Sequence, residues 1–319
     1  MARMTGIAPD RPLLGILLML GFCVLAPLGD ALAKLLGQNL PVGMILLARF
    51  AAQVILLAPL VIATNRPWRM RGRVLRLAAW RTLLHIAGIG MMFSALRFLP
   101  LADAIAIAFV MPFLMLLLGR YVLDEEVGPR RLIACAVGFV GTLLVIQPSF
   151  AAVGWPALLP LGVAVVFALF MLVTRQIARE TDPVSLQAVS GAMATAVVLP
   201  ILLAFGDIGP EMLRLTVPRG SDWALLIAIG AIGTLAHLLM TWSLRHAPAA
   251  TLAPMQYLEI PFATLIGWAI FRDLPNGLSA LGIAITVAAG LYIIARERAT
   301  SRAPRSAPQP QQPAPPAAE

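Results

Sequence analysis

The feature that most constrains this chain is a series of ten apolar stretches, each close to the length that a helix needs to cross a lipid bilayer. About 20 apolar residues in a helix span a hydrocarbon core of about 30 Å. Such stretches cover residues 13–35, 42–63, 77–95, 101–118, 132–146, 155–173, 184–205, 223–244, 249–271 and 278–295. Because lipid offers backbone amides no partners, spans of this kind must be helices. The predicted fold class is an all-α polytopic membrane protein with ten transmembrane helices.

Composition agrees with this prediction and excludes other classes. With 60% hydrophobic and 12% charged residues, the chain has too little polar material to cover a globular surface in water. The net charge of +9 comes from basic residues that lie between apolar runs. Basic residues at such places set the orientation of a membrane protein, so nucleic acid is not expected as a partner. The expected partners are the lipid bilayer and a small-molecule substrate, with a homodimer left open. Cys23 and Cys135 lie in apolar runs, and we expect no metal site and no cofactor.

The second half of the chain repeats the layout of the first. The run Leu-Arg-Phe-Leu-Pro at 96–100 aligns with Leu-Arg-His-Ala-Pro at 244–248. After a one-residue slip, the matches continue with Phe113 on Phe262, Asp124 on Asp273, Gly128 on Gly277, Leu132 on Leu281 and Gly141 on Gly290. Five spans are an odd number, so a second unit of five enters the membrane from the opposite side, and a site is expected where the units meet. We predict two inverted five-helix repeats, residues 1–150 and 151–298, and a disordered cytoplasmic tail, residues 299–319.

The basic residues predict how the chain is oriented. Seventeen of the 24 Lys and Arg residues fall on one side of the predicted spans and four on the other, and three lie within spans. Lys and Arg are enriched in cytoplasmic connections, so both termini are expected in the cytoplasm and the protein in the cytoplasmic (inner) membrane. Arg3 and Arg11, an apolar run and Ala31-Leu32-Ala33 imitate a signal peptide, but we interpret this stretch as a retained first helix.

Three stretches carry a resemblance to a known family. They are LRFLPLADAIAIAFVMPF, the acidic turn LDEEVGPRR leading into GFVGTLLV, and APMQYLEIPFATLIGWAIFRDLPNGLSALG in the second half. On these residues the chain resembles the EamA-type ten-helix transporters of the drug/metabolite transporter superfamily. The resemblance implies a secondary active carrier of the cytoplasmic membrane that moves an amino acid, a vitamin such as riboflavin, or a nucleoside-like compound by alternating access. The family's usual glutamate in the acidic turn matches Glu125, whereas the second-half turn has only the shorter Asp273.

The leading candidate for a substrate-binding and coupling residue is Glu259, which lies midway along a predicted span. An ionisable group there costs about 2.5 to 3.5 kcal/mol on insertion, so its presence needs a reason. We expect Pro254 and Pro261 to break its helix, with Gln256 on the same face and Tyr257 able to cap an aromatic substrate. A buried carboxyl group is a candidate proton carrier, which leaves proton coupling open. The alternative is a protonated glutamate that only fixes packing.

Further polar residues within the spans are weaker candidates. Asp30 and Lys34 stand four apart on the first helix, where they either neutralise one another or form an outer gate. Arg49 is able to pair with Asp30 or to bind an anionic substrate group. His85 and His237 are candidate cavity residues, with packing histidines as the alternative.

Two other residues and two other functions complete the prediction. We expect Arg81 to extend to the cytoplasmic interface, and Arg97 and Asp103 to form a solvated loop pair. No catalytic residues are assigned, because the sequence holds no metalloprotease helix and no glycine-rich nucleotide loop, so an enzyme is not expected. A passive channel or lipid scramblase remains the main alternative to a carrier, and a membrane-embedded enzyme is a more distant one.

Overall fold

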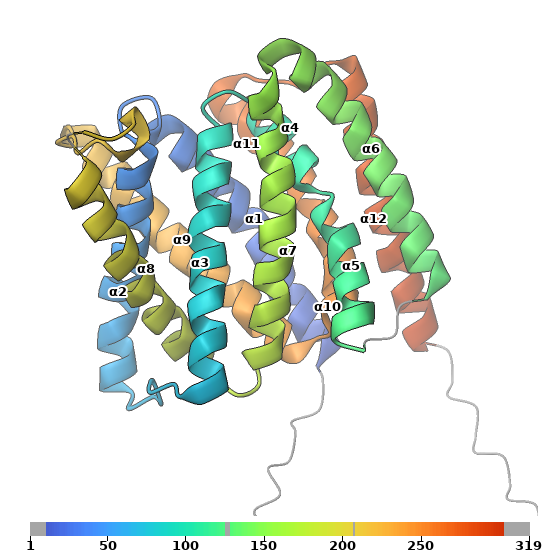
Figure 1. Ribbon diagram of the computed structural model, residues 1–319. Coiled ribbons are helices and arrows are strands. Elements are labelled where there is room, and N and C mark those ends of the chain that lie inside the picture. Colours follow the sequence, from blue (N-terminus) through green and yellow to red (C-terminus); the bar gives the residue numbers. More distant parts are fainter. Residues whose placement is uncertain (1–10, 125–127, 207, 303–319) are drawn as a thin grey trace, which may run out of the picture.

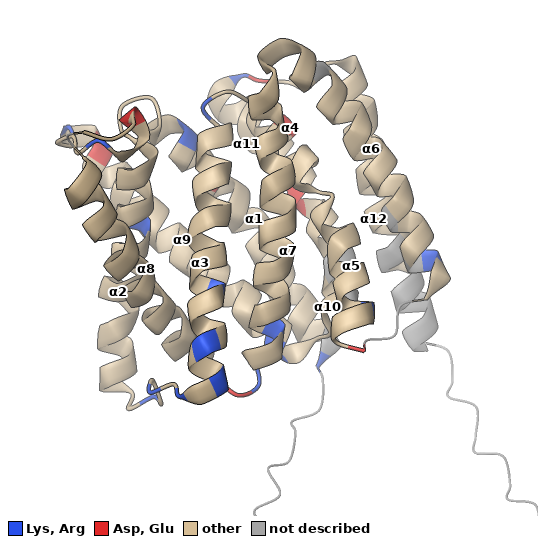
Figure 2. Ribbon diagram, viewed as in Figure 1, with Lys and Arg blue, Asp and Glu red and all other residues tan. Residues whose placement is uncertain are grey.

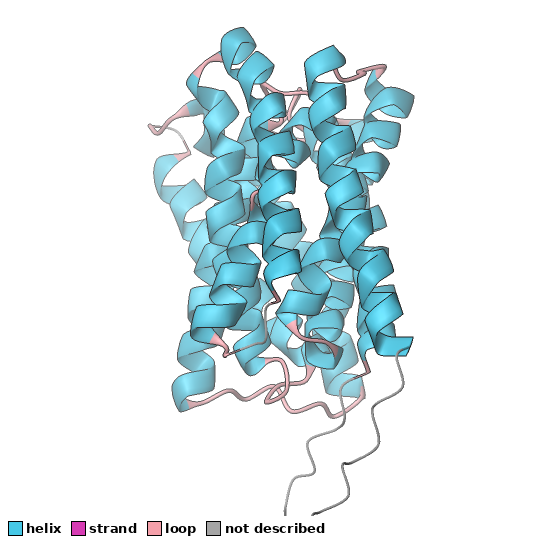
Figure 3. Cartoon of the chain, turned by 90° about the vertical axis from the view of Figure 1, so that its right-hand side faces the viewer, coloured by secondary structure: helices cyan, strands magenta, loops and turns pink. Residues whose placement is uncertain are grey.

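The computed structural model describes residues 11–124, 128–206 and 208–302, and all regular structure in these ranges is helical (Figure 3). The first half contains α1 (Pro12–Leu36), α2 (Val42–Ala63), α3 (Gly72–Ala95), α4 (Leu101–Ala108), α5 (Met111–Val122) and α6 (Pro129–Val153). The second half contains η1 (Trp155–Leu158), α7 (Leu159–Ile177), α8 (Pro183–Phe205), η2 (Glu211–Leu213), α9 (Gly220–His246), α10 (Ala249–Leu252), η3 (Ala253–Leu258), α11 (Glu259–Phe271) and α12 (Gly277–Arg302). The expected tail falls outside the described residues from 303 onward.

The helices have the length and surface of membrane-spanning segments. Seven helical segments among the described residues are long and apolar enough to cross a membrane, and Gly277–Tyr292 is a shorter apolar helix. Large apolar side chains remain on the outside, such as Ile62 of α2 and Leu203 of α8, which are 73% and 65% exposed. Lipid is the solvent that such a surface suits. The chain is therefore a multi-pass helical membrane protein, as the sequence predicted.

The long helices run side by side, and the chain begins and finishes at the same end of the bundle. The start of α1 and the end of α12 both lie at the bottom of Figure 1, which we call the lower end. The connections from α1 to α2 and from α11 to α12 lie at the opposite, upper end. The tertiary core lies between these ends and includes side chains from both halves of the chain.

Two helical segments are interrupted at corresponding places in the two halves. In the first half α4 gives way to α5, which begins at Met111, and in the second half α10 and η3 give way to α11, which begins at Glu259. Pro112 and Pro261 lie in the first turns of α5 and α11, where a missing amide hydrogen costs nothing. The interruption expected near Pro254 is present. The interruption continues to Leu258, within one turn before Pro261, and Pro261 itself lies in the first turn of α11.

The strongest helix packing joins the two halves. α1 packs against α9, α3 against α7, α2 against α8 and α6 against α12. Glycines permit the closest approaches, since a Cβ atom on Gly141 of α6 would lie 2.6 Å from the carbonyl oxygen of Gly282 on α12. Gly230 of α9 likewise faces Ala52 of α2. Small residues of this kind allow membrane helices to pack backbone to backbone.

Candidate functional site

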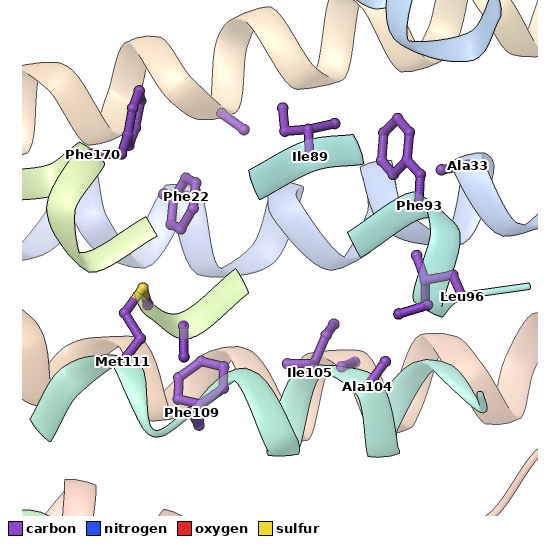
Figure 4. Close-up of a cluster of buried hydrophobic side chains, with 14 of the residues drawn as sticks. Phe22, Ala33, Ile89, Phe93, Leu96, Ala104, Ile105, Phe109, Met111 and Phe170 are labelled. Atoms are coloured by element: carbon purple, nitrogen blue, oxygen red, sulfur yellow. The ribbon is translucent and has the colours of Figure 1, made fainter. Parts of the chain in front are cut away.

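A cavity lies in the interior between the two interrupted helices. Its walls come from α1, α2, α3, α4, α5, α7, α9 and α11. Six of the apolar lining side chains appear together in Figure 4, namely Phe22, Ile89, Phe93, Ile105, Phe109 and Met111. The cavity measures about 90 Å³ for the centre of a water-sized sphere. One water needs roughly 10–15 Å³ on this scale, so several waters fit.

Four polar side chains stand among the apolar residues of the cavity wall, and they are Asp30, Arg49, His237 and Glu259. All four were candidates from the sequence. They come from α1, α2, α9 and α11, so both halves of the chain contribute. A mostly apolar pocket with a few convergent polar groups is the usual form of a small-molecule site.

Arg49 is held firmly at one part of this wall. Its side chain is only 2% exposed, and Nη2 donates to the carbonyl oxygen of Gly233 at 3.2 Å and contacts Nδ1 of His237 at 2.8 Å. The guanidinium group lies against the backbone of α9 at Gly233. A Cβ atom added to this glycine would be only 2.8 Å from Nε of Arg49. The ring of Phe50 lies 5.4 Å from Cζ. The charged group is therefore fixed in one orientation by short contacts to neutral partners.

The two carboxyl groups of the cavity complement this arginine. Glu259 is 7% exposed and is the first residue of α11, where the helix dipole favours a negative charge. Asp30 is half-buried on α1 and interacts electrostatically with both Arg49 and Glu259. The cavity thus has one cationic part and two carboxyl groups within electrostatic range of each other.

Three other predicted site residues are buried but do not line this cavity. The ring of His85 packs against Phe50, Phe170 and His237, with centroid distances of 5.1, 4.6 and 4.4 Å. Gln256 directs Nε2 to the sulfur of Met171 at 3.3 Å. Tyr257 packs against Gly138 of α6, Gly290 of α12 and the ring of Phe109. These contacts place them in the layer behind the cavity wall.

Lys34 has a different partner from the expected one. Its Nζ lies 3.2 Å from Oδ2 of Asp273 and donates to the carbonyl oxygen of Leu99 at 3.1 Å. We expected a pair with Asp30, one turn away, but the carboxylate that contacts Lys34 belongs to the connection between α11 and α12. The contact lies at the upper end of the bundle and joins the two halves of the chain.

The structure also corrects the predictions for Arg81. We expected its side chain to reach the interface, yet it is fully buried. Nε donates to Thr174 at 2.9 Å, Nη1 to Ser190 at 2.9 Å, and Nη2 reaches Thr241 at 3.4 Å. The guanidinium group also lies 4.5 Å from the ring centroid of Phe170. Its acceptors belong to α7, α8 and α9, so no pattern within α3 could have revealed them.

The expected loop pair of Arg97 and Asp103 is wrong as well. Asp103 is only 6% exposed and accepts a hydrogen bond from Oγ of Ser149 at 3.0 Å. Arg97 instead reaches Glu211 at 3.4 Å. Asp103 lies in the first turn of α4, and packing against α6 covers it.

The fold and the site together define a class: a helical membrane protein whose two halves enclose one mostly apolar cavity with a few polar groups. Comparison with known proteins gives the family. A model described as the EamA-like transporter family matches residues 13–147 and again 154–296. The chain belongs to this family, as the resemblance in its sequence predicted.

Curated relatives of the chain are transporters. It is 31% identical over 222 residues to a riboflavin transporter of Brucella anthropi, a match that covers 70% of this chain and 77% of the relative. It is 25% identical over 284 residues to an S-adenosylmethionine uptake transporter of Rickettsia prowazekii, covering 86% and 90%. A pseudopaline exporter of Pseudomonas aeruginosa is 28% identical over 211 residues, covering 66% and 69%.

One solved crystal structure supports the fold independently. It matches with a TM-score of 0.66 and 17% sequence identity, and it covers 92% of this chain and 98% of the other. At this identity the likeness concerns the fold alone.

Proposed function

We propose that this chain is a secondary active transporter that moves a small organic metabolite across the cytoplasmic membrane by alternating access. The observation that carries the proposal is the pairing of two EamA-like units around a cavity lined by polar groups from both units. Relatives named for riboflavin, S-adenosylmethionine and pseudopaline support a substrate of the size of a vitamin or a nucleoside-like metabolite. The substrate-binding residues are Glu259, Arg49 and His237 in the wall, with His85, Gln256 and Tyr257 behind them.

The proposed architecture is ten transmembrane helices in two inverted five-helix repeats. If α1, α2, α3, α4 with α5, and α6 correspond to α7, α8, α9, α10 with α11, and α12, the packing pattern is unchanged when the halves are exchanged. The contact of α1 with α9 becomes that of α7 with α3, and the pairs of α2 with α8 and of α6 with α12 map onto themselves. The two family matches fall within the proposed units 1–150 and 151–298.

Hydrogen bonds at opposite ends support the inversion. Lys34, near the end of α1, donates to the carbonyl oxygen of Leu99 after α3. Arg175, near the end of α7, donates to the carbonyl oxygen of Leu244 near the end of α9 at 2.6 Å. These are matching places in the two units, yet one contact lies at the upper end and the other at the lower end, as a copy inverted in the membrane requires.

The lower end is proposed to face the cytoplasm, with both termini there. Blue segments in Figure 2 mark basic residues, and several lie at the lower end, including those of α3 and of the connection before it. A labelling experiment tests this orientation. In a variant whose cysteines are replaced by serine, an impermeant thiol reagent on intact cells is expected to modify Glu211→Cys and not Trp68→Cys. The reverse pattern would contradict the orientation.

Ion pairs at both ends suit a cycle of alternate opening. Lys34 and Asp273 lie 3.2 Å apart at the upper end, and Arg66 and Asp182 lie 2.9 Å apart at the lower end. Exposed pairs of this kind are weak, about 0–1 kcal/mol each, so a transporter can break one set while the other holds. We propose that Lys34 gates the upper end, and that Asp30 and Glu259 couple substrate binding to this change.

A flux experiment tests the proposal as a whole. The purified protein in proteoliposomes is expected to show saturable uptake of at least one organic metabolite, driven by an imposed gradient. Riboflavin and S-adenosylmethionine are the first probes, followed by compounds whose levels change in cells that lack the protein. Flux that rises linearly with concentration and never exceeds passive equilibration would favour a channel instead.

Glu259→Gln tests the role of the carboxyl group, because it keeps the shape and removes the charge. We expect gradient-driven accumulation to be lost while exchange of substrate across the membrane continues. Glu211→Gln, at the exposed upper end, is the matched control and should transport normally. Full accumulation in the Glu259→Gln variant would remove this residue from the coupling proposal.

A further inference from the structure

Two of the buried polar atoms that have no hydrogen-bond partner among the described residues belong to residues that line the cavity. They are Nη1 of Arg49 and Nε2 of His237. Both side chains are more than nine-tenths buried, and both belong to residues that line the cavity. A buried polar atom left without a partner is unfavourable, and natural proteins satisfy most of them. The two atoms therefore leave hydrogen-bonding capacity beside the cavity that a ligand can use.

The hydrogen-bond chemistry makes Nη1 of Arg49 a donor and favours the same role for Nε2 of His237. A guanidinium group only donates hydrogen bonds. Nδ1 of His237 lies 2.8 Å from Nη2 of Arg49 and 3.1 Å from the carbonyl oxygen of Gly233. We assign Nδ1 as the acceptor of the shorter contact, because a proton on Nδ1 would face an arginine nitrogen that only donates. A neutral imidazole with a bare Nδ1 holds its proton on Nε2. The missing partner must then supply hydrogen-bond acceptors to Nη1 and Nε2.

The surroundings favour an acceptor with a negative charge. The hydrogen-bond partners of Arg49 among the described residues are a carbonyl oxygen and a neutral ring, and Asp30 interacts with it electrostatically without an ion-pair contact. Gly233 supplies the space in which the guanidinium group lies, so the donor is positioned before a ligand arrives. A planar guanidinium in a fixed orientation matches the geometry of a carboxylate.

The rest of the cavity wall restricts the class of ligand further. Asp30 and Glu259 line the same cavity, and in their ionised forms they would repel a ligand that carried only negative charge. A ligand with a carboxylate at one end and a positive group at the other satisfies both parts. Aromatic walls such as Phe22 and Phe167 suit a flat or apolar portion of the ligand between its two charged ends.

We propose, on the basis of the transport function above, that Arg49 and His237 bind the carboxylate of a zwitterionic substrate. Arg49 Nη1 and His237 Nε2 each donate to this carboxylate, and the positive group of the substrate faces Asp30 and Glu259. The substrate class is therefore an amino-acid-like zwitterion rather than an uncharged ring compound.

Binding of matched ligand pairs to the purified full-length protein tests this proposal. The pairs are S-adenosylmethionine with its decarboxylated form and phenylalanine with phenylalanine amide, and riboflavin is the uncharged reference. The readout is the rise in unfolding temperature with ligand concentration. In at least one pair we expect the carboxylate member to bind tenfold or more tightly than its partner. Equal binding in every pair, or binding of riboflavin alone, would overturn the proposal.

Variants then assign the preference to the two donors. Arg49→Gln is expected to remove the preference for the carboxylate member, whereas Asp30→Asn, in the same wall, should keep it. If Arg49→Gln does not fold, Gly233→Ala serves instead, because the added methyl group displaces the guanidinium group without changing any charge. A preference that survives in a folded Arg49→Gln or Gly233→Ala variant contradicts the assignment.

The flux experiment separates this inference from the transport proposal. Saturable transport of riboflavin without any carboxylate preference would support the transport proposal and contradict the zwitterion site. Arg49-dependent binding without transport in any gradient would support the zwitterion site and contradict the transport proposal.

Discussion

Among the described residues, two arginines are buried inside the helical bundle, and their surroundings differ in one decisive respect. Arg81 of α3 has a hydroxyl acceptor for each of Nε, Nη1 and Nη2. Arg49 of α2 shares Nη2 between two partners, and its Nη1 has none among the described residues. Only Arg49 lines the cavity.

The difference teaches that burial alone does not identify a binding residue. Arg81 joins α3 to α7, α8 and α9 with its hydrogen-bonding groups satisfied, which is the arrangement of a structural residue. Arg49 is equally buried, but its hydrogen-bonding groups are not all satisfied, which is the arrangement expected of a ligand-binding residue.

The largest expected effect comes from removing acceptors around Arg81. Ser190→Ala combined with Thr174→Val leaves two of its nitrogens buried without partners. Each loss is expected to cost about 1–3 kcal/mol of the free energy of unfolding. Thermal unfolding in detergent measures the change. Thr195→Val is the control, because the Thr195 hydroxyl donates to the carbonyl oxygen of Gly191 within its own helix. Equal destabilisation by the control and the double variant would contradict the structural role of Arg81.

An intermediate effect is expected from paired lysine substitutions, which sharpen the contrast directly. Lysine keeps the charge but lacks the planar fork. Arg81→Lys should lower the unfolding temperature while folded molecules transport normally. Arg49→Lys should weaken substrate binding about tenfold, the loss of one charged hydrogen bond of about 1.4 kcal/mol, with a smaller change in unfolding temperature. If both variants lose stability and transport in the same proportion, the two arginines do not differ in role.

The smallest effect concerns the upper ion pair. Asp273 is 39% exposed at its side chain, so solvent screens the contact with Lys34, and the pair is expected to contribute at most about 0.5–1 kcal/mol. Lys34→Asp should change the transport rate several-fold, and adding Asp273→Lys should restore it. Rescue by Asp30→Lys instead would show that the original sequence-based pair, and not the observed one, is formed during transport.

Much of the fold follows from the sequence alone. Apolar stretches of about 20 residues leave a backbone in lipid no alternative to the helix, so the all-helical membrane fold is fixed by composition and length. The repeat could be recognised because glycine and proline mark turns and breaks, and Pro112 and Pro261 lie in the first turns of α5 and α11. Glu259 was found because a carboxyl group inside an apolar span is costly.

Only the tertiary structure decided which side chains meet. Helical periodicity shows which residues share a face but not which helix that face contacts. Helical spacing therefore predicted that Lys34 pairs with Asp30, four residues away, whereas its partner in the structure is Asp273, which is 239 residues distant. For the same reason the contact between Arg49 and His237, separated by 188 residues, and the enclosure of Arg81 by three other helices could not be read from any local pattern. The charges in the spans were visible in the sequence, but whether each was satisfied or left open to a ligand depended on packing.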